Sequence, residues 1–451
     1  MGKYQGYGKY KDSAVEWLGE IPDHWEVKQL KYIKSKEKNA FVDGPFGSNL
    51  KTVHFVTDGD AFVIESEFAT RGKLIEEGLK QITLDHFLTI QRSSAKGGDI
   101  IIAKIGAYFG LNNILPNLSK PAVVSGNSLK LSINTNTCCT KFIHYLLLHL
   151  KESGAIDLQV SITAQPALSL GGMNRLQSSI PPLEEQEKIA RFLDYKTKQI
   201  DELIAKKEAL IEKLDEKRTA LISHAVTKGL DPNVPMKDSG IEWLGEIPQH
   251  WNIISIKRFS EIYDCKHKTV SFIDDGLPVA SIAQVQNFYI DLSAAKKTTR
   301  EEFLDMIEGG REPQNGDIIF SRNATVGASA IVRNDIFCMG QDVCLIRPIK
   351  TDSIFLNYNF RAFFIKSQIN TYLLGSTFKR INVEEVKNLL ICLPTLTEQE
   401  KIVTFIEQKT AEIDQQKAKI QQAIEVLKEY RTALITNAVT GKIDVRQVPI
   451  P

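Results

Sequence analysis

The 451-residue sequence lacks several features that would assign it to a common functional class. It contains no apolar run near the roughly 20 residues of a membrane-spanning helix, and its first residues lack the apolar stretch of a signal peptide. We therefore expect a soluble, cytoplasmic protein with no membrane partner. The six cysteines form no C-x-x-C pair and no Cys/His cluster with ligand spacing. Buried thiols are expected in their place, with no disulfide framework and no metal site.

Signatures of nucleotide-dependent and methyl-transferring enzymes are also missing. The sequence has no G-x-x-x-x-G-K-[ST] phosphate loop, no G-x-G-x-x-G after a predicted strand, and no Asn/Asp-Pro-Pro-aromatic tetrapeptide of adenine methylation. The eight histidines do not cluster, and His144 and His149 lie on an apolar helical segment, where we expect core or boundary residues. We find no catalytic constellation, so we expect neither catalysis nor a bound cofactor.

An excess of positive charge is absent as well. Lysine and arginine total 56 against 55 aspartate and glutamate, which gives a net charge of +1. The balance is nearly even in every segment, with 20 basic and 17 acidic residues in 1–182 and 10 of each in 183–230. This excludes a nucleic-acid binder that relies on overall positive charge, but it leaves local basic patches open.

An internal repeat organises the chain, whose length predicts at least two domains. Residues 11–25 (KDSAVEWLGEIPDHW) and 237–251 (KDSGIEWLGEIPQHW) agree at 12 of 15 positions and hold all four tryptophans, which we interpret as packing residues. The pentapeptide EQEKI occurs at 185–189 and 398–402, and RTALI occurs at 218–222 and 431–435. A weaker match, GDII, lies at 98–101 and 316–319. The chain is a tandem duplication with similar frames and divergent interiors.

Each EQEKI motif opens a predicted long helix, the first running from about Leu183 to about Val226. Positions 189, 193, 196, 200, 203, 207, 210, 214, 217 and 221, with their equivalents from 402 to 434, carry mostly apolar residues in steps of four and three. This period is typical of a coiled-coil seam. We expect the two helices to pair antiparallel within the chain; the alternative is that each pairs with another chain.

The interiors read as mixed α/β. Strands are predicted at 100–102, 123–124 and 129–131 and again at 318–320, 330–332 and 343–346, with helices at 141–151 and 357–374. The fold class expected is α+β: two mixed α/β domains separated by two long antiparallel coiled-coil helices in a pseudo-twofold tandem repeat. The boundaries expected are 1–182 and 229–394 for the domains, 183–228 and 395–440 for the helices, and 441–451 for a tail.

These motifs resemble those of the specificity (S) subunit of type I restriction–modification systems. The resemblance rests on P-[PT]-L-x-E-Q-E-K-I after each interior, R-T-A-L-I-[ST]-x-A-V-T at the end of each helix, GIEWLGEIP at 240–248, GPFGSNLK at 44–51 and GDII at 98–101. It implies two target-recognition domains that each read one half of a split, asymmetric DNA site, while the helices set the spacer.

The same resemblance implies the partners and the type of activity. The expected partners are double-stranded DNA, two modification (methyltransferase) subunits, and restriction (endonuclease/translocase) subunits, with no catalysis by this chain. Two alternatives are kept open: a coiled-coil scaffold, and a DNA-acting enzyme whose catalytic site is not recognised.

Candidate DNA contacts are polar or cationic side chains on loops that could enter a groove. In the first domain they are Ser48, Asn49, Lys51, Lys104, Tyr108, Asn112, Asn113, Gln165 and Arg175. In the second they are Lys296, Lys297, Arg300, Arg322, Asn323, Thr325, Thr377, Lys379 and Arg380. Lys104 and Arg322 both follow the aligned GDII motif, which favours them. For any single residue the alternative is ordinary surface solubility.

The ends of the two helices predict one further contact. Residues 227–235 connect the first helix to the second tryptophan motif, whereas the second helix is followed only by residues 441–451. We expect residues 11–25 to pack near the end of the second helix, as residues 237–251 would near the end of the first.

Overall fold

The computed structural model describes residues 4–161, 167–373 and 380–450. The chain folds into two compact units: unit 1 comprises residues 1–206 and 423–451, and unit 2 comprises residues 207–422. Two long helices, α5 (Leu183–Lys228) and α10 (Leu396–Val439), each contribute to both units. Within the described ranges no helix has the length and apolarity needed to cross a lipid bilayer.

Unit 1 contains short strands and helices in addition to its parts of α5 and α10. Its strands are β1 (Tyr10–Asp12), β2 (Glu20–Pro22), β3 (Glu26–Gln29), β4 (Phe41–Asp43), β5 (Ala61–Ile64), β6 (Lys80–Ile82), β7 (Ser94–Ala95), β8 (Ile100–Ala103), β9 (Asn112–Ile114), β10 (Ala122–Val124), β11 (Ser128–Leu131), β12 (Val160–Ser161), β13 (Ala167–Leu168) and β14 (Gln177–Ile180). Its helices are α1 (Ser66–Arg71), α2 (Leu84–Thr89), α3 (Thr140–Glu152) and α4 (Leu170–Arg175), with 3-10 turns η1 (Leu30–Tyr32), η2 (Thr52–His54), η3 (Glu76–Gly78), η4 (Gln91–Ser93) and η5 (Asp157–Gln159).

Unit 2 is built from a similar set of elements. Its strands are β15 (Met236–Asp238), β16 (Glu246–Pro248), β17 (Asn252–Ser255), β18 (Ser260–Asp264), β19 (Leu277–Ala280), β20 (Lys296–Thr298), β21 (Ile318–Ser321), β22 (Ser329–Ile331), β23 (Cys338–Met339), β24 (Val343–Pro348) and β25 (Leu390–Leu393). Its helices are α6 (Arg300–Ile307), α7 (Ser353–Arg361), α8 (Phe363–Leu373) and α9 (Val383–Asn388), with 3-10 turns η6 (Ile256–Arg258) and η7 (Ile282–Val285).

The two units share one sheet plan, as the repeat predicts. Unit 1 has an antiparallel sheet β4-β11-β8-β9 and a mixed sheet β6-β5-β10-β7, in which β5 and β10 are parallel. Unit 2 has the corresponding antiparallel sheet β18-β24-β21-β22 and a mixed sheet β20-β19-β23, in which β19 and β23 are parallel. The predicted strands at 100–102, 123–124, 129–131, 318–320 and 343–346 are confirmed as β8, β10, β11, β21 and β24, and β22 overlaps the strand predicted at 330–332.

The central strand of each antiparallel sheet is buried on both faces. In β8, Ile100 and Ile102 belong to the core formed with α3 and the long helices, whereas Ile101 and Ala103 belong to a second core against the mixed sheet. In β21, Ile318 and Ile319 divide between two cores in the same way. Because successive side chains of a strand point to opposite faces, such a strand reads as a continuous apolar run.

One predicted helix is divided in the structure. Within the described residues 357–373, the helix predicted at 357–374 forms parts of α7 and α8, which are separated at Ala362, whose backbone is extended (φ −74°, ψ 153°). Phe360 and Phe364, on either side of the break, are both buried in one core. The prediction of a single helix was therefore wrong. No glycine or proline stands at the break, so nothing in the sequence pointed to it. The predicted helix 141–151 is confirmed as α3.

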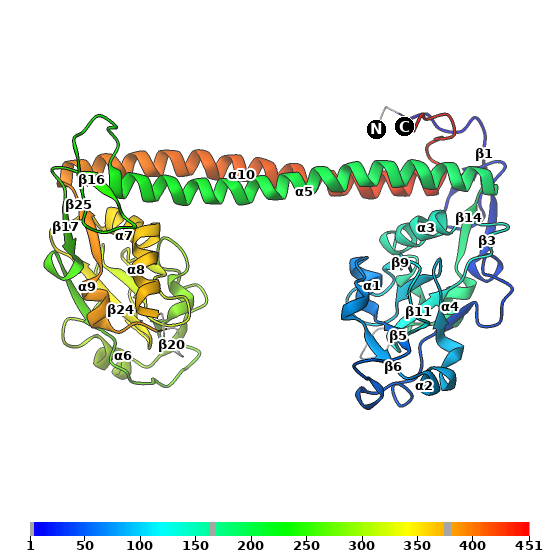
Figure 1. Cartoon of the computed structure of the whole chain (residues 1–451), viewed down its shortest axis with the longest axis horizontal. Helices are drawn as coiled ribbons and strands as arrows, with labels where there is room; N and C mark the ends of the chain where they lie inside the picture. Colours follow the sequence, from blue (N-terminus) through cyan, green and yellow to red (C-terminus); the bar gives the residue numbers. More distant parts are fainter. Residues whose placement is uncertain (1–3, 162–166, 374–379, 451) are drawn as a thin grey trace. The chain divides into compact units, whose positions relative to one another are not determined.

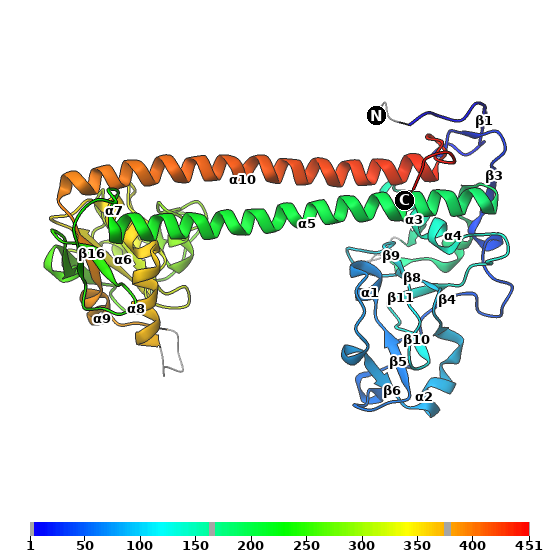
Figure 2. The same ribbon diagram turned by 45° about the horizontal axis from the view of Figure 1, so that its top comes forward.

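Helices α5 and α10 contact each other in both units, where they lie side by side in Figures 1 and 2. In unit 2, Lys417 pairs with Asp215 at 2.5 Å and Arg218 pairs with Asp414 at 2.6 Å. Residues later in α5 therefore pair with residues earlier in α10, so the two helices run in opposite directions. In unit 1, Arg431 of α10 pairs with Asp201 of α5 at 2.9 Å.

The predicted register of the helical seam was wrong in the middle of the helices, at positions 203, 210 and 217, whereas Ile189 and Ile402 near the helix N-termini are buried as predicted. Leu203 and Leu210, assigned to the seam, are 43% and 45% exposed, whereas the next residues, Ile204 and Ile211, are partly buried. In α10 the same displacement places Lys417 and Arg431 in the seam instead of Gln416 and Tyr430. Paired apolar residues at 203–204 and 210–211 satisfy both registers, so periodicity alone could not choose between them.

The repeated motifs meet at a junction in unit 1. Glu185 of the first EQEKI motif is buried and accepts hydrogen bonds from the Trp25 indole N–H at 3.0 Å and the Tyr7 hydroxyl at 2.5 Å. Its other oxygen lies 2.8 Å from Nε2 of His24. The motif glutamate is thus the acceptor for the tryptophan motif, which explains why both recur together.

Unit 2 contains a matching junction with fewer contacts. Glu398 of the second EQEKI motif lies 2.8 Å from Nε2 of His250 and accepts a 3.3 Å hydrogen bond from Trp251. The glutamine that follows each motif glutamate has the same role in both units. Gln186 accepts from the backbone N–H of Cys139, just before α3, and Gln399 accepts from that of Asp352, just before α7.

The predicted contact between residues 11–25 and the end of the second helix is confirmed. The Tyr10 hydroxyl donates to the carbonyl of Gly441 at 2.9 Å, and a side chain at Gly441 would overlap Pro22 and contact Trp25. In unit 2, Gly229 occupies the equivalent place against Trp251. Both glycines have positive φ, 72° and 77°, and follow a helix C-terminus, where the left-handed conformation favours glycine.

We expect two largely enclosed histidines to make unit 1 sensitive to acid. His149 is hydrogen-bonded to Thr436, and Nδ1 of His144 lies 2.8 Å from Oδ1 of Asn112. Burial lowers the pKa of each histidine to about 4. As pH falls below the unfolded pKa of about 6.5, the unfolded state binds more protons than the folded state, so stability is lost between these pKa values.

We expect each histidine to cost unit 1 about 2 kcal/mol of unfolding free energy when the pH is lowered from 7 to 5. H149Q removes one titrating group and should roughly halve this loss. Helix α7, which takes the place of α3 in unit 2, contains no histidine, so unit 2 lacks this pair and serves as the comparison, although it holds histidines elsewhere. Pulse proteolysis with fragments assigned to each unit measures the effect; an equal acid loss in both units, or none recovered by H149Q, would contradict the explanation.

Candidate nucleic-acid interface

A carboxylate at the end of β4 holds one candidate residue of unit 1, Lys104, in place. Asp43 accepts a 2.9 Å hydrogen bond from Arg92 and a 3.2 Å hydrogen bond from Nζ of Lys104. Partial burial raises the pKa of this carboxyl, but the hydrogen bonds from the two cations outweigh it and hold the pKa below its usual range. Lys104 is therefore placed by an ion pair and is only partly exposed.

Three loops of unit 1 meet at this carboxylate. A Cβ atom on Gly44 would overlap the carbonyl of Ser125, so the loop after β4 packs backbone to backbone on the loop before β11. The N–H of Lys104 donates to the carbonyl of Asn127 at 2.8 Å, which joins the loop after β8 to the same place. Loops 44–51, 104–110 and 125–128 form one surface, which we call the unit 1 loop surface.

Unit 2 repeats this arrangement with different side chains. Arg322, directly after β21, pairs at 2.6 Å with Asp264 at the end of β18. The N–H of Arg322 donates to the carbonyl of Asp342 at 2.9 Å, as that of Lys104 does to Asn127. The duplication therefore places a strand-end aspartate, a cation and three loops at the same position in both units.

A cavity of about 700 Å³ lies among these loops in unit 2. Its lining includes Lys296 and two residues that contact other candidates. Gln286 donates to Thr325 at 2.9 Å, and Asp342 lies 3.6 Å from Arg380, which also forms a backbone bridge with Asn323. One predicted residue, Lys296, therefore lines the cavity, while Thr325 and Arg380 contact residues that line it. We call the cavity and these neighbouring residues the unit 2 loop surface.

Three predicted residues are not placed to contact DNA, and these expectations are corrected. Asn112 is buried against His144, and the amide of Asn113 donates to the carbonyl of Ala69 at 2.9 Å. The Arg322 side chain is 3% exposed and is held by Asp264. Asn112 and Asn113 belong to β9 and Arg322 directly follows β21, so all three side chains bond to neighbouring elements of the fold rather than standing on an open loop.

The other predicted residues lie at the surface or outside the described ranges. Those that are exposed or partly exposed, besides the ones already placed, are Ser48, Asn49, Lys51, Tyr108, Arg175, Lys297 and Arg300. Those outside the described residues are Gln165, Thr377 and Lys379.

Sequence reasoning missed several exposed polar residues on both loop surfaces. Arg92 and Asn127 in unit 1, and Lys268, Gln286 and Gln341 in unit 2, lie at these surfaces. The signal that could have found them is alignment of the loops after equivalent strands, because the sheet order is shared even where the loop sequences are not.

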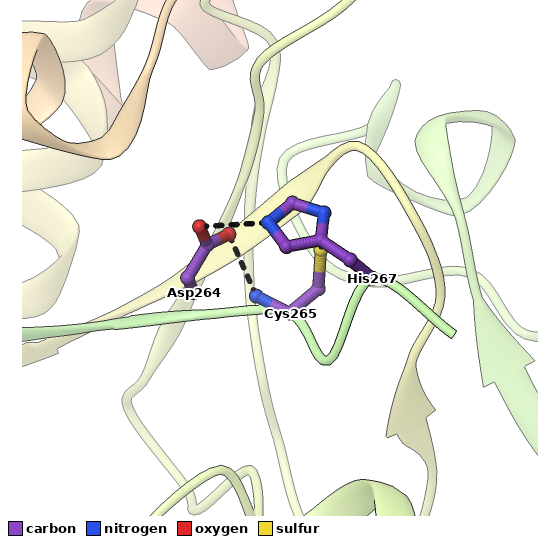
Figure 3. A group of neighbouring side chains, drawn as sticks. All are labelled: Asp264, Cys265 and His267. Carbon is purple, nitrogen blue, oxygen red and sulfur yellow. Dashed lines mark hydrogen bonds and ion pairs between the residues drawn. The ribbon is translucent and has the colours of Figure 1, made fainter.

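Three potential metal ligands lie together in unit 2, as Figure 3 shows. Nε2 of His267 is 3.1 Å from Asp264, and Sγ of Cys265 is 3.8 Å from Nδ1 of His267. The guanidinium of Arg322 contacts both Asp264 and Cys265, at 2.6 and 3.6 Å. Because this buried cation already neutralises the carboxylate and would repel a divalent ion, we interpret the group as an ion-pair network.

The sequence matches a family model described as the type I restriction modification DNA specificity domain. The match covers residues 22–213 and 248–426, which is more than half of the chain and includes both copies of the repeat.

Individual proteins similar to this chain carry related descriptions. The type I restriction enzyme MjaVIII specificity subunit of Methanocaldococcus jannaschii is 22% identical over 447 residues, 95% of each chain. The EcoBI specificity subunit of Escherichia coli is 23% identical over 421 residues, 88% of this chain and 85% of that protein.

A solved structure shares the fold. It was reported under a title on complex assembly and conformational transition of the type I R-M system, and it aligns with a TM-score of 0.65 at 16% identity over 93% of this chain and 98% of the other. With the repeated motifs and the duplicated sheet plan, the family match is decisive: the chain belongs to the family of type I restriction–modification specificity subunits.

Proposed function

We propose that each unit carries a target-recognition domain, residues 1–182 and 229–394, and that each domain reads one half of a bipartite, asymmetric site in double-stranded DNA. The observation that carries this proposal is the equivalent position of the two loop surfaces. Asp43 with Lys104 and Asp264 with Arg322 form the same support, whereas the surrounding loops differ in sequence. One scaffold with two sets of side chains fits two half-sites of different sequence.

The helices α5 and α10 are proposed to form an antiparallel coiled coil, over 183–228 and 395–440, that sets the spacer between the half-sites. The ion pairs of Asp215 with Lys417 and of Asp201 with Arg431 support this role, because they fix the register of the helices in each unit. Exposed ion pairs add little stability, so the buried apolar seam residues, such as Ile200 and Ile424, supply most of it.

The proposed protein partners are two modification (methyltransferase) subunits, with restriction (endonuclease/translocase) subunits joining them. The exposed apolar residues left outside the seam support docking on the helices: Leu203, Val426 and Tyr430 in unit 1 and Leu210 in unit 2. Exposed apolar side chains that gather into a patch are typical of protein interfaces.

Catalysis is assigned to the partners. The chain itself is proposed to be non-catalytic, to need no cofactor and to work in the cytoplasm, where its DNA substrate is. The alternative of an enzyme with an unrecognised site has no supporting cluster, since the one compact group of potential metal ligands among the described residues is held by Arg322.

Selection from a random duplex library tests this function. The chain is assembled with its modification subunits, bound duplexes are recovered, and their sequences are compared. We expect two short specified segments separated by an unspecified gap of fixed length. A single continuous motif, or no enrichment, would contradict the proposal. In a parallel assay, the chain alone with Mg²⁺ and S-adenosylmethionine should neither cleave nor methylate DNA.

A further inference from the structure

The side chain of Phe46 is 70% exposed although the backbone around it is firmly held. A Cβ atom on Gly44 would overlap the carbonyl of Ser125, and one on Gly126 would lie 2.7 Å from the carbonyl of Pro45. Neither glycine could carry a side chain without separating the two loops. Loop 44–47 therefore packs directly on loop 125–128, and Phe46 extends from a supported backbone.

The turn that follows Phe46 is fixed as well. The N–H of Asn49 donates to the carbonyl of Phe46 at 2.7 Å, and Nε2 of His86 lies 2.9 Å from the carbonyl of Asn49. A Cβ atom on Gly47 would have no neighbour within 4 Å, so the space beside the ring is open. The ring is therefore presented in a fixed position, where it can contact a partner without further ordering of the loop.

The surroundings of Phe46 indicate which kind of partner would contact it. Ser48, Asn49 and Lys51 follow it on the exposed part of the same loop, and the pair of Lys104 with Asp43 lies at the loop's base. Polar groups and cations around one apolar ring suit a nucleic acid, in which cations contact phosphates while apolar wedges enter between stacked bases.

We propose that Phe46 inserts as a wedge between two adjacent base pairs of the half-site that unit 1 reads, partly unstacking them and kinking the duplex. This inference rests on the proposed function and adds a specificity-determining residue to it. Pyrimidine–purine steps unstack most easily, so the wedge selects for sequence at a step to which it makes no hydrogen bond.

Unit 2 is not built to insert a ring in this way. Phe272 lies on the corresponding loop after β18 and is 51% exposed, but Nζ of Lys296 lies 4.6 Å from its ring centroid, and the ring lines the cavity of the unit 2 loop surface. The wedge is therefore confined to one half-site, which makes the expected DNA distortion asymmetric.

The test uses 2-aminopurine as a fluorescent reporter of base unstacking. The chain is assembled with its modification subunits on duplexes that carry the methylation-mapped site. The probe is placed in turn at each adenine except those that the modification subunits methylate, because a methyltransferase flips its target base out of the stack whether or not a wedge is present. The native chain should increase the fluorescence at one step in the unit 1 half-site and nowhere in the other. F46A should abolish the increase and weaken binding roughly tenfold, since the loss of one aromatic–base contact is of this size.

Matched variants separate a wedge from other roles. F46L keeps an apolar wedge and should retain the fluorescence increase, whereas Y32A, which removes another aromatic side chain of unit 1 that is 66% exposed, should change nothing. A full fluorescence increase with F46A would overturn the proposal, as would failure of F46A to assemble with the modification subunits, which would assign Phe46 to a protein contact. If the native complex shows no sequence-selective binding, the proposed function itself fails.

Discussion

Replacing Glu185 by alanine is expected to lower the free energy of unfolding of unit 1 by about 4 kcal/mol, because two buried donors lose their acceptor. The indole N–H of Trp25 and the hydroxyl of Tyr7 both point at this carboxylate, and both side chains are buried. Burial, followed by the hydrogen bond to Glu185, raises the pKa of Tyr7 above its usual value, so the hydroxyl remains a donor at any pH where the protein folds.

The repeat supplies a matched comparison for this variant. Glu398 is more exposed than Glu185, and its hydrogen bond from Trp251 is longer, at 3.3 Å. We expect E398A to lower the free energy of unfolding of unit 2 by about 1–2 kcal/mol. Glu187 is an exposed neighbour of Glu185 on α5, and E187A should leave the free energy of unfolding of unit 1 almost unchanged. Hydrogen exchange measured by mass spectrometry reports each unit separately. Equal protection in E185A and E187A would mean that the carboxylate does not hold the junction.

Lengthening both long helices is expected to change the spacer in the DNA site and leave the half-site bases unchanged. Inserting seven residues into α5 within Ile200–Leu214 and seven into the facing part of α10 preserves the steps of three and four in the seam. At 1.5 Å per residue the helices lengthen by about 10 Å, which corresponds to about three base pairs.

Methylation mapping in cells that carry the whole system measures this directly. The gap should lengthen by about three base pairs with the same bases specified on either side. The control is insertion into α5 alone, which should abolish modification. The helices would then differ in length, so the ion pairs on the two sides of the insertion, such as Arg218 with Asp414, could not all form at once. Altered half-site bases with an unchanged gap would contradict the role of the helices.

Elements defined by strong local patterns were predicted well from the sequence. The duplication, the buried strands of each central sheet and the pairing of α5 with α10 all follow from repeated motifs or from continuous apolar runs. The contact of Trp25 with Gly441 was predicted from the order of the motifs alone, since the same segment follows the first helix in the other copy.

Features that depend on tertiary packing could not be predicted in this way. Leu203 and Ile204 are equally apolar, so only the partner helix decides which one is buried. The sequence predicts Arg322 as a DNA contact because it is a cation that directly follows a strand. In the structure it forms an ion pair with Asp264, which lies 58 residues earlier in the sequence. The cavity beside Lys296 also forms from distant segments, and no local pattern identifies it.

The measurement that tests the central claim most directly is the methylation map of a chain whose unit 1 interior has been exchanged. Residues 26–180 extend from the start of β3 to the end of β14, two strands that pair with each other, so a related interior can replace them without cutting the junction at Glu185. If each unit reads one half-site, the half-site read by unit 2 and the length of the gap stay the same, while the half-site read by unit 1 changes. A map in which both halves change, or neither does, would contradict the account.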